Sequence, residues 1–225
     1  MFTSFFRTIQ GEGASTGRNV MFVRLFTEHC FPNKKRCSFC DTVGQPYWRE
    51  NHNLEEFYGL VKTTDCKHFV ITGGEPLQPE SYKDLLIMAC MLSDFEKTYE
   101  IETNGAFLNK LEDDTVIRRA THINISPKMK NSHVGFDYDR RNEVYHNEKL
   151  KWKFVLDPKN LKESWQEVEQ WIVDARLDET NIWIMCQTPA TQEEKKSIFN
   201  LAIEKGVNYS PRLHIDLFGD IEEEI

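Results

Sequence analysis

The chain has 225 residues, and its 28 Lys and Arg against 36 Asp and Glu give a formal net charge of −8. Hydrophobic residues make up 40% and charged residues 28%, a balance that excludes disordered and fibrous classes and allows a sizeable core. An acidic chain without a basic stripe is not expected to bind nucleic acid, because neutralising phosphates needs clustered Lys and Arg.

No segment of the sequence predicts membrane insertion or export. The longest apolar run covers residues 85–92, eight residues, far short of the roughly 20 that a spanning helix needs. The N-terminal stretch MFTSFFRTIQ lacks a cationic head followed by a long apolar run, so we expect no signal peptide. These features predict a soluble, cytoplasmic protein with no membrane partner.

The hydrophobic pattern alternates between strand and helix along most of the chain. In chain order, strands are predicted at residues 19–26, 68–71, 98–101, 122–125, 152–156 and 181–185. Helices are predicted at residues 54–61, 80–92, 111–119, 161–175 and 193–205, the last of them stopping at Gly206. Residues 129–147 show no clear period, which indicates a long irregular connection.

Strands that alternate with helices favour a parallel sheet with right-handed crossovers. About six such units are too few for a closed eight-stranded barrel and enough for a partial one. No internal repeat, low-complexity tract or Gly/Ser linker divides the chain. We therefore predict an α/β fold, a partial (β/α)6 barrel, in one domain over residues 1–225.

Unusual short motifs follow five of the predicted strands. Three cysteines follow the first strand, and the other four motifs are TGGEP at 72–76, ETNG at 102–105, SPK at 126–128 and QTPA at 187–190. In parallel α/β folds the loops beyond the carboxyl ends of the strands converge on one face and build the site. The motifs are therefore expected to lie together.

The cysteines leave three interpretations open. Cys37 and Cys40 form a Cys-x-x-Cys pair, and Cys30 lies seven residues before Cys37. A zinc site would need a fourth ligand, which His29 or His52 could supply. A thioredoxin-like pair would leave Cys30 unexplained. An iron–sulfur cluster normally takes four cysteines, so three would leave one iron open to a ligand from outside the chain. The remaining cysteines lack motif spacing and are taken as structural: Cys66, Cys90 and Cys186.

The TGGEP segment also has two interpretations. Its two glycines allow a ligand to approach the backbone closely, and Glu75 could hold an ammonium group. The alternative is a tight strand-to-helix turn in which Pro76 starts the helix.

Taken together, Cys-x-x-Cys after the first strand and GGEP after the second resemble the radical S-adenosylmethionine (SAM) superfamily. The resemblance implies the compact, partial-barrel fold of that superfamily. It also implies a [4Fe–4S] cluster on three cysteines, with the SAM amine and carboxylate on the fourth iron. Phe39, the aromatic residue inside the cysteine pair, is characteristic of that superfamily, and the GGE backbone typically receives the SAM ammonium.

Further motifs narrow the resemblance. FRTIQGEG at 6–13, FVRL at 22–25, CDT at 40–42 and SPRLH at 210–214, with the motifs above, are similar to the 7-carboxy-7-deazaguanine synthase (QueE) family over residues 6–218. The resemblance implies a carbon–nitrogen lyase of queuosine-type 7-deazapurine biosynthesis. It would convert 6-carboxy-5,6,7,8-tetrahydropterin to 7-carboxy-7-deazaguanine with loss of ammonia, and regenerate SAM. Mg²⁺, a homodimer and an electron-donor protein such as flavodoxin are also implied.

The same resemblance implies a role for each matching residue. The cluster ligands are Cys30, Cys37 and Cys40, and the Mg²⁺ ligand is Thr42. Residues expected at SAM are Phe39, Gly74, Glu75, Ser126, Pro127, Lys128 and Gln187. Residues expected at the pterin are Ile9, Gln10, Gly11, Glu12, Arg24, Thr72 and His214.

The sequence departs from the family pattern in two places. Six residues separate Cys30 from Cys37, where the superfamily usually has three, and Thr188 is inserted where the family often has Gln-Pro. Two other functions remain as alternatives: a radical SAM activating enzyme that acts on a partner protein, and a zinc-binding interaction module. The first should lack the QGEG and CDT motifs, and the second has no need of TGGEP or SPK.

Overall fold

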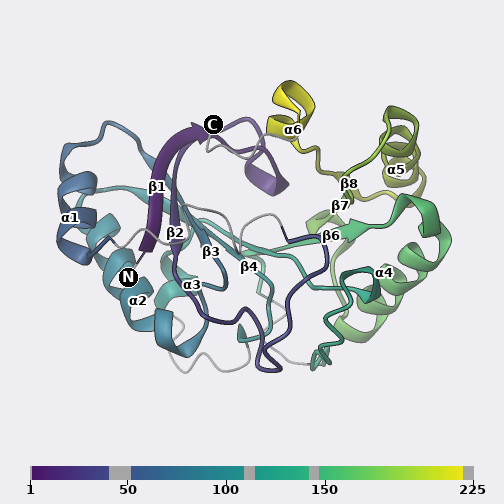
Figure 1. Ribbon diagram of the computed structural model, residues 1–225, viewed down its shortest axis with the longest axis horizontal. Helices are drawn as coiled ribbons and strands as arrows, with labels where there is room; N and C mark the ends of the chain where they lie inside the picture. The colour runs from purple at the N-terminus through teal and green to yellow at the C-terminus, as the bar shows by residue number, and fades with distance from the viewer. Residues whose placement is uncertain (1, 41–51, 109–114, 142–146, 220–225) are drawn as a thin grey trace.

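The computed structural model describes residues 2–40, 52–108, 115–141 and 147–219, and one eight-stranded sheet runs through them in the order β1 to β8 (Figure 1). The strands are β1 (Phe2–Ile9), β2 (Asn19–Leu25), β3 (His68–Gly73), β4 (Thr98–Thr103), β5 (Ile123–Ile125), β6 (Leu150–Leu156), β7 (Ile182–Cys186) and β8 (Asn208–Tyr209). β1 pairs antiparallel with β2, and every later pair is parallel. β1 and β8 form the edges, so the sheet is an open, partial barrel.

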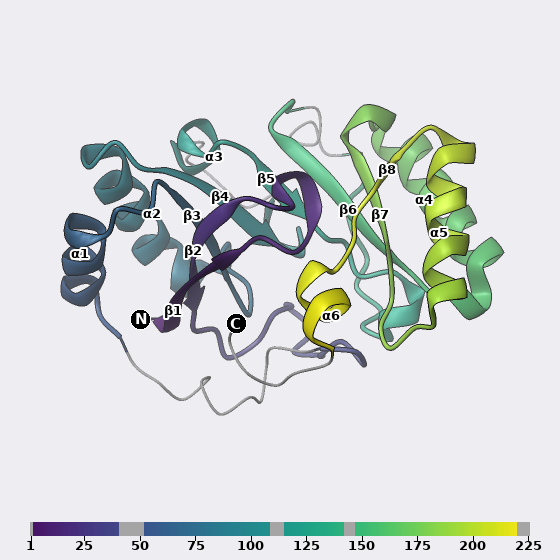
Figure 2. The ribbon, with the colours of Figure 1, turned by 90° about the horizontal axis from the view of Figure 1, so that it is seen from above.

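The larger helices flank this sheet. They are α1 (Leu54–Thr63), α2 (Pro79–Asp94), α3 (Thr115–Arg119), α4 (Leu161–Ala175) and α5 (Gln192–Lys205). α1 and α2 lie at one end of the sheet, and α4 and α5 at the other (Figures 1 and 2). A short sixth helix, α6 (Leu213–Phe218), lies apart from them, and the backbone N–H of Leu213 donates to the carbonyl of Gly11 at 3.1 Å. The C-terminal segment therefore contacts the turn between β1 and β2.

The six predicted strands correspond to β2–β7, which confirms the predicted fold class. Four predicted helices match α1, α2, α4 and α5, and α5 ends at Gly206 in the left-handed region as expected. Part of the helix predicted at 111–119 is observed as α3, the rest lying outside the described residues. β1, β8 and α6 were not predicted. β8 has two residues, and the FTSFFRTI of β1 places apolar residues on both faces, which hides the period of two.

Alternation along the strands separates two faces of the sheet. Phe57 of α1 packs edge-on against Phe2 and Phe69, with ring centroids 5.7 and 6.1 Å apart, so these strand residues face the helices. Their neighbours in sequence point the other way. The strand register then brings polar side chains of adjacent strands together on the face away from the helices. They are Arg24, Thr72, Glu100, Glu102, Asn124 and Lys153.

The end of β3 approaches β2 more closely than a side chain would allow. Gly73 has a φ of +138°, and a Cβ there would lie 2.1 Å from the carbonyl oxygen of Leu25. Only glycine fits this position. The first glycine of TGGEP therefore has a steric role in fixing where the loop after β3 begins.

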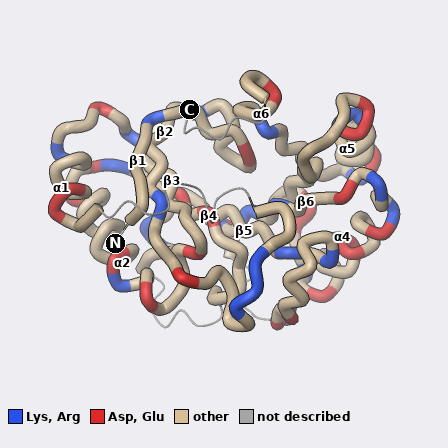
Figure 3. Tube along the Cα trace, viewed as in Figure 1, with Lys and Arg blue, Asp and Glu red and all other residues tan. Residues whose placement is uncertain are grey.

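Charged residues of both signs are spread along the described chain. Lys and Arg are interspersed with Asp and Glu (Figure 3). Among the described residues, no helix combines the length and apolar character that crossing a membrane requires.

Candidate active site

The motif loops beyond the carboxyl ends of the strands contact one another, as predicted. We call them the rim loops: residues 26–40, 74–78, 104–108, 126–134 and 187–190. The side chain of Asn104 donates to the carbonyl of Cys30 at 2.7 Å, and its backbone N–H donates to the Glu75 carboxylate at 2.8 Å. The Thr103 hydroxyl also donates to Glu75, at 2.5 Å. The ETNG motif thus ties the cysteine loop to GGEP.

The SPK loop joins the same assembly through a tyrosine. The Lys128 backbone N–H donates to the Tyr138 hydroxyl at 2.9 Å, and that hydroxyl donates to the Asn104 carbonyl at 3.0 Å. The Lys128 ammonium donates to the Ser126 hydroxyl at 3.1 Å. Ser126 and Pro127 are buried, whereas Lys128 is partly exposed. The ammonium of Lys128 is therefore held at the rim with access to solvent.

The QTPA loop reaches the cysteine loop through one asparagine. Asn131 donates to the side-chain oxygen of Gln187 at 2.9 Å, and its carbonyl accepts from the Ser38 hydroxyl at 3.3 Å. The Ser38 N–H donates to the Ser132 carbonyl at 3.0 Å. Five loops that are far apart in sequence are thus joined by hydrogen bonds on one face.

All three predicted cluster ligands lie on this rim, and none of them is in a disulfide. Cys30 and Cys37 are partly buried and Cys40 is exposed. Burial, together with the nearby Glu75, Cys40 and Cys37, raises the pKa of the Cys30 thiol to about 12, and Lys128 opposes the shift. A group of thiols that destabilise one another's charge suits a cationic iron centre, which favours thiolates as ligands. The chemistry of this donor set therefore fits an iron–sulfur cluster.

Single-ion metal sites are not preformed in the part of the chain that the structure describes. No three His, Cys, Asp or Glu side chains there form a group arranged to hold one ion. Of the alternative zinc ligands, His52 packs against Phe5 with the rings tilted and their centroids 4.6 Å apart, and it lies 3.6 Å from Glu56. His29 lies 3.8 Å from Glu28. The predicted Mg²⁺ ligand Thr42 falls outside the described residues.

Glu75 is turned inward. Its carboxylate is fully buried and accepts hydrogen bonds from Thr103, the Asn104 backbone and the Leu77 backbone. Burial raises its pKa to about 7, although these donors and Lys128 oppose the rise. In this conformation the Glu75 carboxylate organises the rim loops, while Gly74 remains partly exposed.

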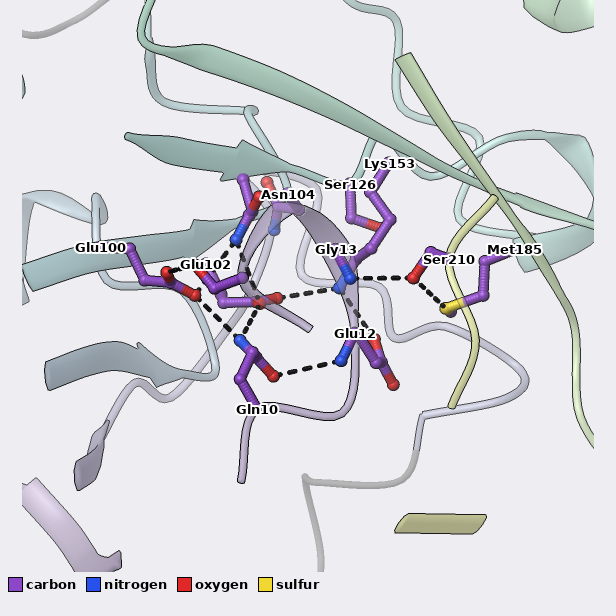
Figure 4. A network of polar contacts seen from close by, with 12 residues as sticks. Gln10, Glu12, Gly13, Glu100, Glu102, Asn104, Ser126, Lys153, Met185 and Ser210 are labelled. Atoms are coloured by element: carbon purple, nitrogen blue, oxygen red, sulfur yellow. Dashed lines mark hydrogen bonds and ion pairs between the residues drawn. The ribbon is translucent and has the colours of Figure 1, made fainter. Parts of the chain in front are cut away.

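A second cluster lies inside the barrel, and we call it the inner wall: Gln10, Glu12, Glu100, Glu102, Asn124 and Lys153 (Figure 4). The buried Lys153 ammonium donates to Glu12 at 2.8 Å and to Glu102 at 2.9 Å. Arg212, just before α6, donates to the other Glu12 oxygen at 2.7 Å. Two cations thus bind Glu12, and one is shared with Glu102.

Gln10 connects the two ends of this wall. Its side-chain NH₂ donates to Glu100 at 2.9 Å and to Glu102 at 3.0 Å, and its oxygen accepts from the Glu12 backbone N–H at 3.3 Å. Asn124 donates to the same two glutamates at 3.3 and 3.4 Å. These amides separate the Glu100 and Glu102 carboxylates, which would otherwise repel each other in a buried site.

The three carboxyl groups of the wall titrate differently. Burial raises the pKa of each, but Lys153 and Arg212 more than offset this at Glu12, whose pKa is lowered. The pKa of Lys153 is raised: burial opposes its charge, and the two glutamates outweigh burial. Burial keeps the pKa of Glu102 above its ordinary value, because Lys153 only partly compensates and Glu12 and Glu100 add negative charge. Glu102 is therefore the wall carboxylate that most readily takes up a proton.

The remaining predicted pterin contacts surround this wall. Arg24 is beside Thr72 in the parallel register of β2 and β3, and its guanidinium lies 5.4 and 5.9 Å from the ring centroids of Phe6 and Phe22. Stacking on two rings holds the guanidinium in place.

The β1–β2 turn supplies the other predicted contacts. A Cβ on Gly11 would lie 2.4 Å from His214 Nδ1, so the imidazole packs directly on that glycine. Ile9 is 48% exposed and stands away from this packing.

Three residues of the wall, Glu100, Asn124 and Lys153, were missed by motif reasoning, whereas Glu102 belongs to the ETNG motif that was expected on this face. Glu100 and Glu102 alternate with Tyr99 and Ile101 in TYEIET, and Lys153 is flanked by two buried aromatics in LKWKFVL. Polar residues that alternate with buried apolar ones indicate a strand with a polar inner face. That signal was present in the sequence.

No protein-family model matches the chain. It is 30% identical to the 7-carboxy-7-deazaguanine synthase of Pyrobaculum aerophilum over 96% of this chain and 93% of that protein. Identity to the enzyme of the same name from Halobacterium salinarum is 26%, over 97% of this chain and 90% of the relative. Among solved structures, QueE from Escherichia coli superposes with a TM-score of 0.66 over 95% of this chain and 93% of that chain, at 20% identity, which supports the fold.

Proposed function

Because the chain belongs to the 7-carboxy-7-deazaguanine synthase family, we propose that it is a radical SAM lyase that converts 6-carboxy-5,6,7,8-tetrahydropterin to 7-carboxy-7-deazaguanine and ammonia. The observation that carries the proposal is that β4 contributes to both the rim loops and the inner wall. Thr103 and Asn104 bind the loops that carry the cysteines and GGEP, while Glu102, one residue earlier, belongs to the inner wall. A cofactor on the rim would therefore face a substrate on the wall.

Cys30, Cys37 and Cys40 would hold a [4Fe–4S] cluster as thiolates. When bound with SAM, the cluster supplies the reducing electron and the radical that starts the reaction. The exposed backbone of Gly74 would receive the SAM ammonium. The Lys128 ammonium, fixed by Ser126, would bind the SAM carboxylate, and the chain supplies this placement and charge.

Arg24 and Thr72 would bind the carboxylate of the pterin. The guanidinium is planar and suits a bidentate contact with a carboxylate, and it already lies over the rings of Phe6 and Phe22. Glu12 retains acceptor capacity beyond its bonds to Lys153 and Arg212, because an ionised carboxylate offers about four lone-pair positions. That capacity suits the guanidine-like edge of the pterin.

The pterin ring would lie beside the residues of the β1–β2 turn and the C-terminal segment: Ile9, Gln10, Gly11 and His214. Glu102 would hold a proton at its carboxylate and donate it to the nitrogen that leaves as ammonia, since burial raises its pKa. The fully buried Lys153 and Glu100 exclude water from the back of this site.

The partners and the Mg²⁺ ion also belong to this proposal. Residues 34–36, Lys-Lys-Arg, are exposed between Cys30 and Cys37, and three adjacent cations suit an acidic electron carrier such as flavodoxin. Thr42 would ligate Mg²⁺, which prefers oxygen ligands. We further propose a homodimer, the cytoplasm as the site of action, and SAM as a regenerated cofactor.

One assay tests the reaction. The protein is purified and reconstituted without oxygen, then incubated with SAM, dithionite, Mg²⁺ and 6-carboxytetrahydropterin, and the product is identified by mass and ultraviolet spectrum. We expect 7-carboxy-7-deazaguanine without stoichiometric 5′-deoxyadenosine. A protein that cleaves SAM and ignores the pterin would instead favour an activating enzyme, and a colourless zinc protein would overturn both.

A further inference from the structure

Glu100 lies behind the candidate substrate site, and no step proposed above uses its carboxylate. One oxygen, Oε2, accepts hydrogen bonds from His68 at 3.0 Å, from His122 at 3.2 Å and from the Ser15 hydroxyl. All four side chains are buried or nearly so. Three donors from three separate parts of the chain therefore fix this oxygen on the side away from the site.

The other oxygen, Oε1, faces the site. It accepts from the Gln10 NH₂ at 2.9 Å and from the Asn124 NH₂ at 3.3 Å. Gln10 also donates to Glu102 at 3.0 Å, so both N–H groups of its amide have carboxylate acceptors. The amide oxygen accepts one bond at 3.3 Å from the Glu12 backbone and keeps a second lone pair.

The charge on Glu100 decides which way the Gln10 amide points. Burial opposes ionisation, but hydrogen bonds from His122 and His68 outweigh it and hold the pKa of Glu100 below its ordinary value. An ionised carboxylate only accepts hydrogen bonds, so Gln10 has to present NH₂ toward it. Together with Glu102 and the Glu12 backbone N–H, the Glu100 carboxylate thus holds the amide with its oxygen away from Glu100.

We propose that Glu100 is a positioning residue for the substrate, acting through Gln10. By holding the Gln10 NH₂, it presents the amide oxygen as an acceptor for an N–H group of the pterin ring and prevents the opposite orientation. The inference rests on the proposed function, because it takes the pterin as the ligand that Gln10 contacts.

Binding of an unreactive pterin tests the role directly. 6-Carboxypterin, the oxidised form, is titrated into the reconstituted protein by isothermal calorimetry, and SAM is titrated separately. We expect Glu100→Gln to weaken pterin binding about tenfold, as the loss of a hydrogen bond to a charged group does, with SAM affinity changed less than about twofold. Glu163→Gln on the exposed side of α4 is the matched control and should change neither.

A double-mutant cycle separates positioning from general damage. If Glu100 acts through Gln10, Glu100→Gln should have less than about a twofold effect in a Gln10→Ala background. Equal effects of Glu100→Gln in both backgrounds would overturn the proposal, as would a parallel loss of SAM and pterin binding.

Gln10→Glu keeps the test decisive if Glu100→Gln does not fold. A carboxylate accepts a hydrogen bond from a pterin N–H at least as well as an amide oxygen does. If Glu100 and Glu102 did not constrain residue 10, the Gln10→Glu protein would therefore bind the pterin equally well or better. Because both glutamates repel a carboxylate at this position, we expect pterin binding to weaken at least about tenfold. Unchanged or tighter binding would contradict the proposal.

The wild-type titration distinguishes a failure of the proposed function from a failure of the positioning role of Glu100. If the wild-type protein neither binds 6-carboxypterin nor converts the tetrahydropterin, the proposed function fails and this inference falls with it. If the wild type binds the pterin and Glu100→Gln binds it equally well, only the positioning role fails.

Discussion

The rim loops are joined largely by hydrogen bonds between neutral side chains and backbone groups, whereas the inner wall is held together through charged side chains. At the rim, the carbonyls of Cys30, Asn104 and Asn131 accept the hydrogen bonds that join separate loops. In the wall, Lys153 and Gln10 join the buried Glu100 to the partly buried Glu12 and Glu102. The two regions meet at β4, which contributes to both.

The difference predicts how each region responds to change. A rim side chain that only binds a cofactor can be removed with little effect on folding, because the backbone contacts remain. Removing a member of the wall leaves a buried charge without its partner, which is strongly destabilising. Rim substitutions should therefore abolish activity in a folded protein, and wall substitutions should reduce both stability and substrate binding.

The largest effect on activity is expected at the rim. Cys37→Ala removes one of three proposed cluster ligands, so we expect no product and little bound iron after reconstitution. The free energy of unfolding should change by less than about 1 kcal/mol, because the side chain is only partly buried. Cys90→Ala, a change in another partly buried cysteine, is the control and should retain iron. A Cys37→Ala protein that binds as much iron as the wild type and remains active would contradict the assignment of Cys37 as a cluster ligand.

The largest effect on stability is expected in the wall. Lys153→Met leaves Glu12 and Glu102 without their shared cation and should lower the free energy of unfolding by about 3–5 kcal/mol, measured by denaturant titration. Lys151→Met is the control on the same strand, since the Lys151 ammonium donates to two neutral acceptors, the backbone carbonyl of Glu148 and the side-chain oxygen of Asn181. Its loss should cost about 1 kcal/mol. If both variants lost the same free energy of unfolding, Lys153 would not be coupled to Glu12 and Glu102 as described.

Two glycines should respond to alanine with opposite signs. Gly73→Ala places a Cβ against Leu25 in a backbone conformation that only glycine adopts easily, and should destabilise by about 1–3 kcal/mol. Gly59→Ala, within α1 with open space around it, should stabilise by about 0.5–1 kcal/mol. Thermal unfolding of both variants measures the contrast. Stabilisation by Gly73→Ala would contradict the close approach of the two strands.

The smallest effect is a pH dependence in the wall. The pKa of Glu100 is lowered on folding from an ordinary value of 4.5, so its ionisation stabilises the folded state above pH 4.5. That contribution declines as the pH falls below 4.5. The stability difference between wild type and Glu100→Gln should therefore be largest near neutral pH and shrink on acidification. A difference that stays constant from pH 7 to pH 3 would argue against a paired carboxylate.

The rim could be predicted from the sequence because its motifs are short and contiguous. TGGEP, ETNG and SPK each follow a strand, and the rule that strand ends converge was enough to bring them together. What the rule could not supply was the linkage itself. The contacts of Asn104 with Cys30 and Glu75 depend on the conformations of three loops, which no local pattern encodes.

The wall was harder to predict because its members come from the β1–β2 turn and from three strands, β4, β5 and β6. Lys153 meets Glu12 across 141 positions of sequence, and only the strand register and the β1–β2 turn bring them together. The alternation in TYEIET does place Glu100 and Glu102 on one face, so these two of the six wall residues were within reach of pattern reasoning. β1 itself was missed, and with it the position of Gln10.

The most direct measurement is a structure of the reconstituted protein with SAM and 6-carboxypterin bound. The account predicts SAM at the rim, near Gly74 and Lys128, and the pterin against the inner wall, with the Gln10 amide oxygen accepting an N–H from the ring. A pterin bound outside the barrel, or a Gln10 amide that presents its NH₂ to the ring, would contradict it.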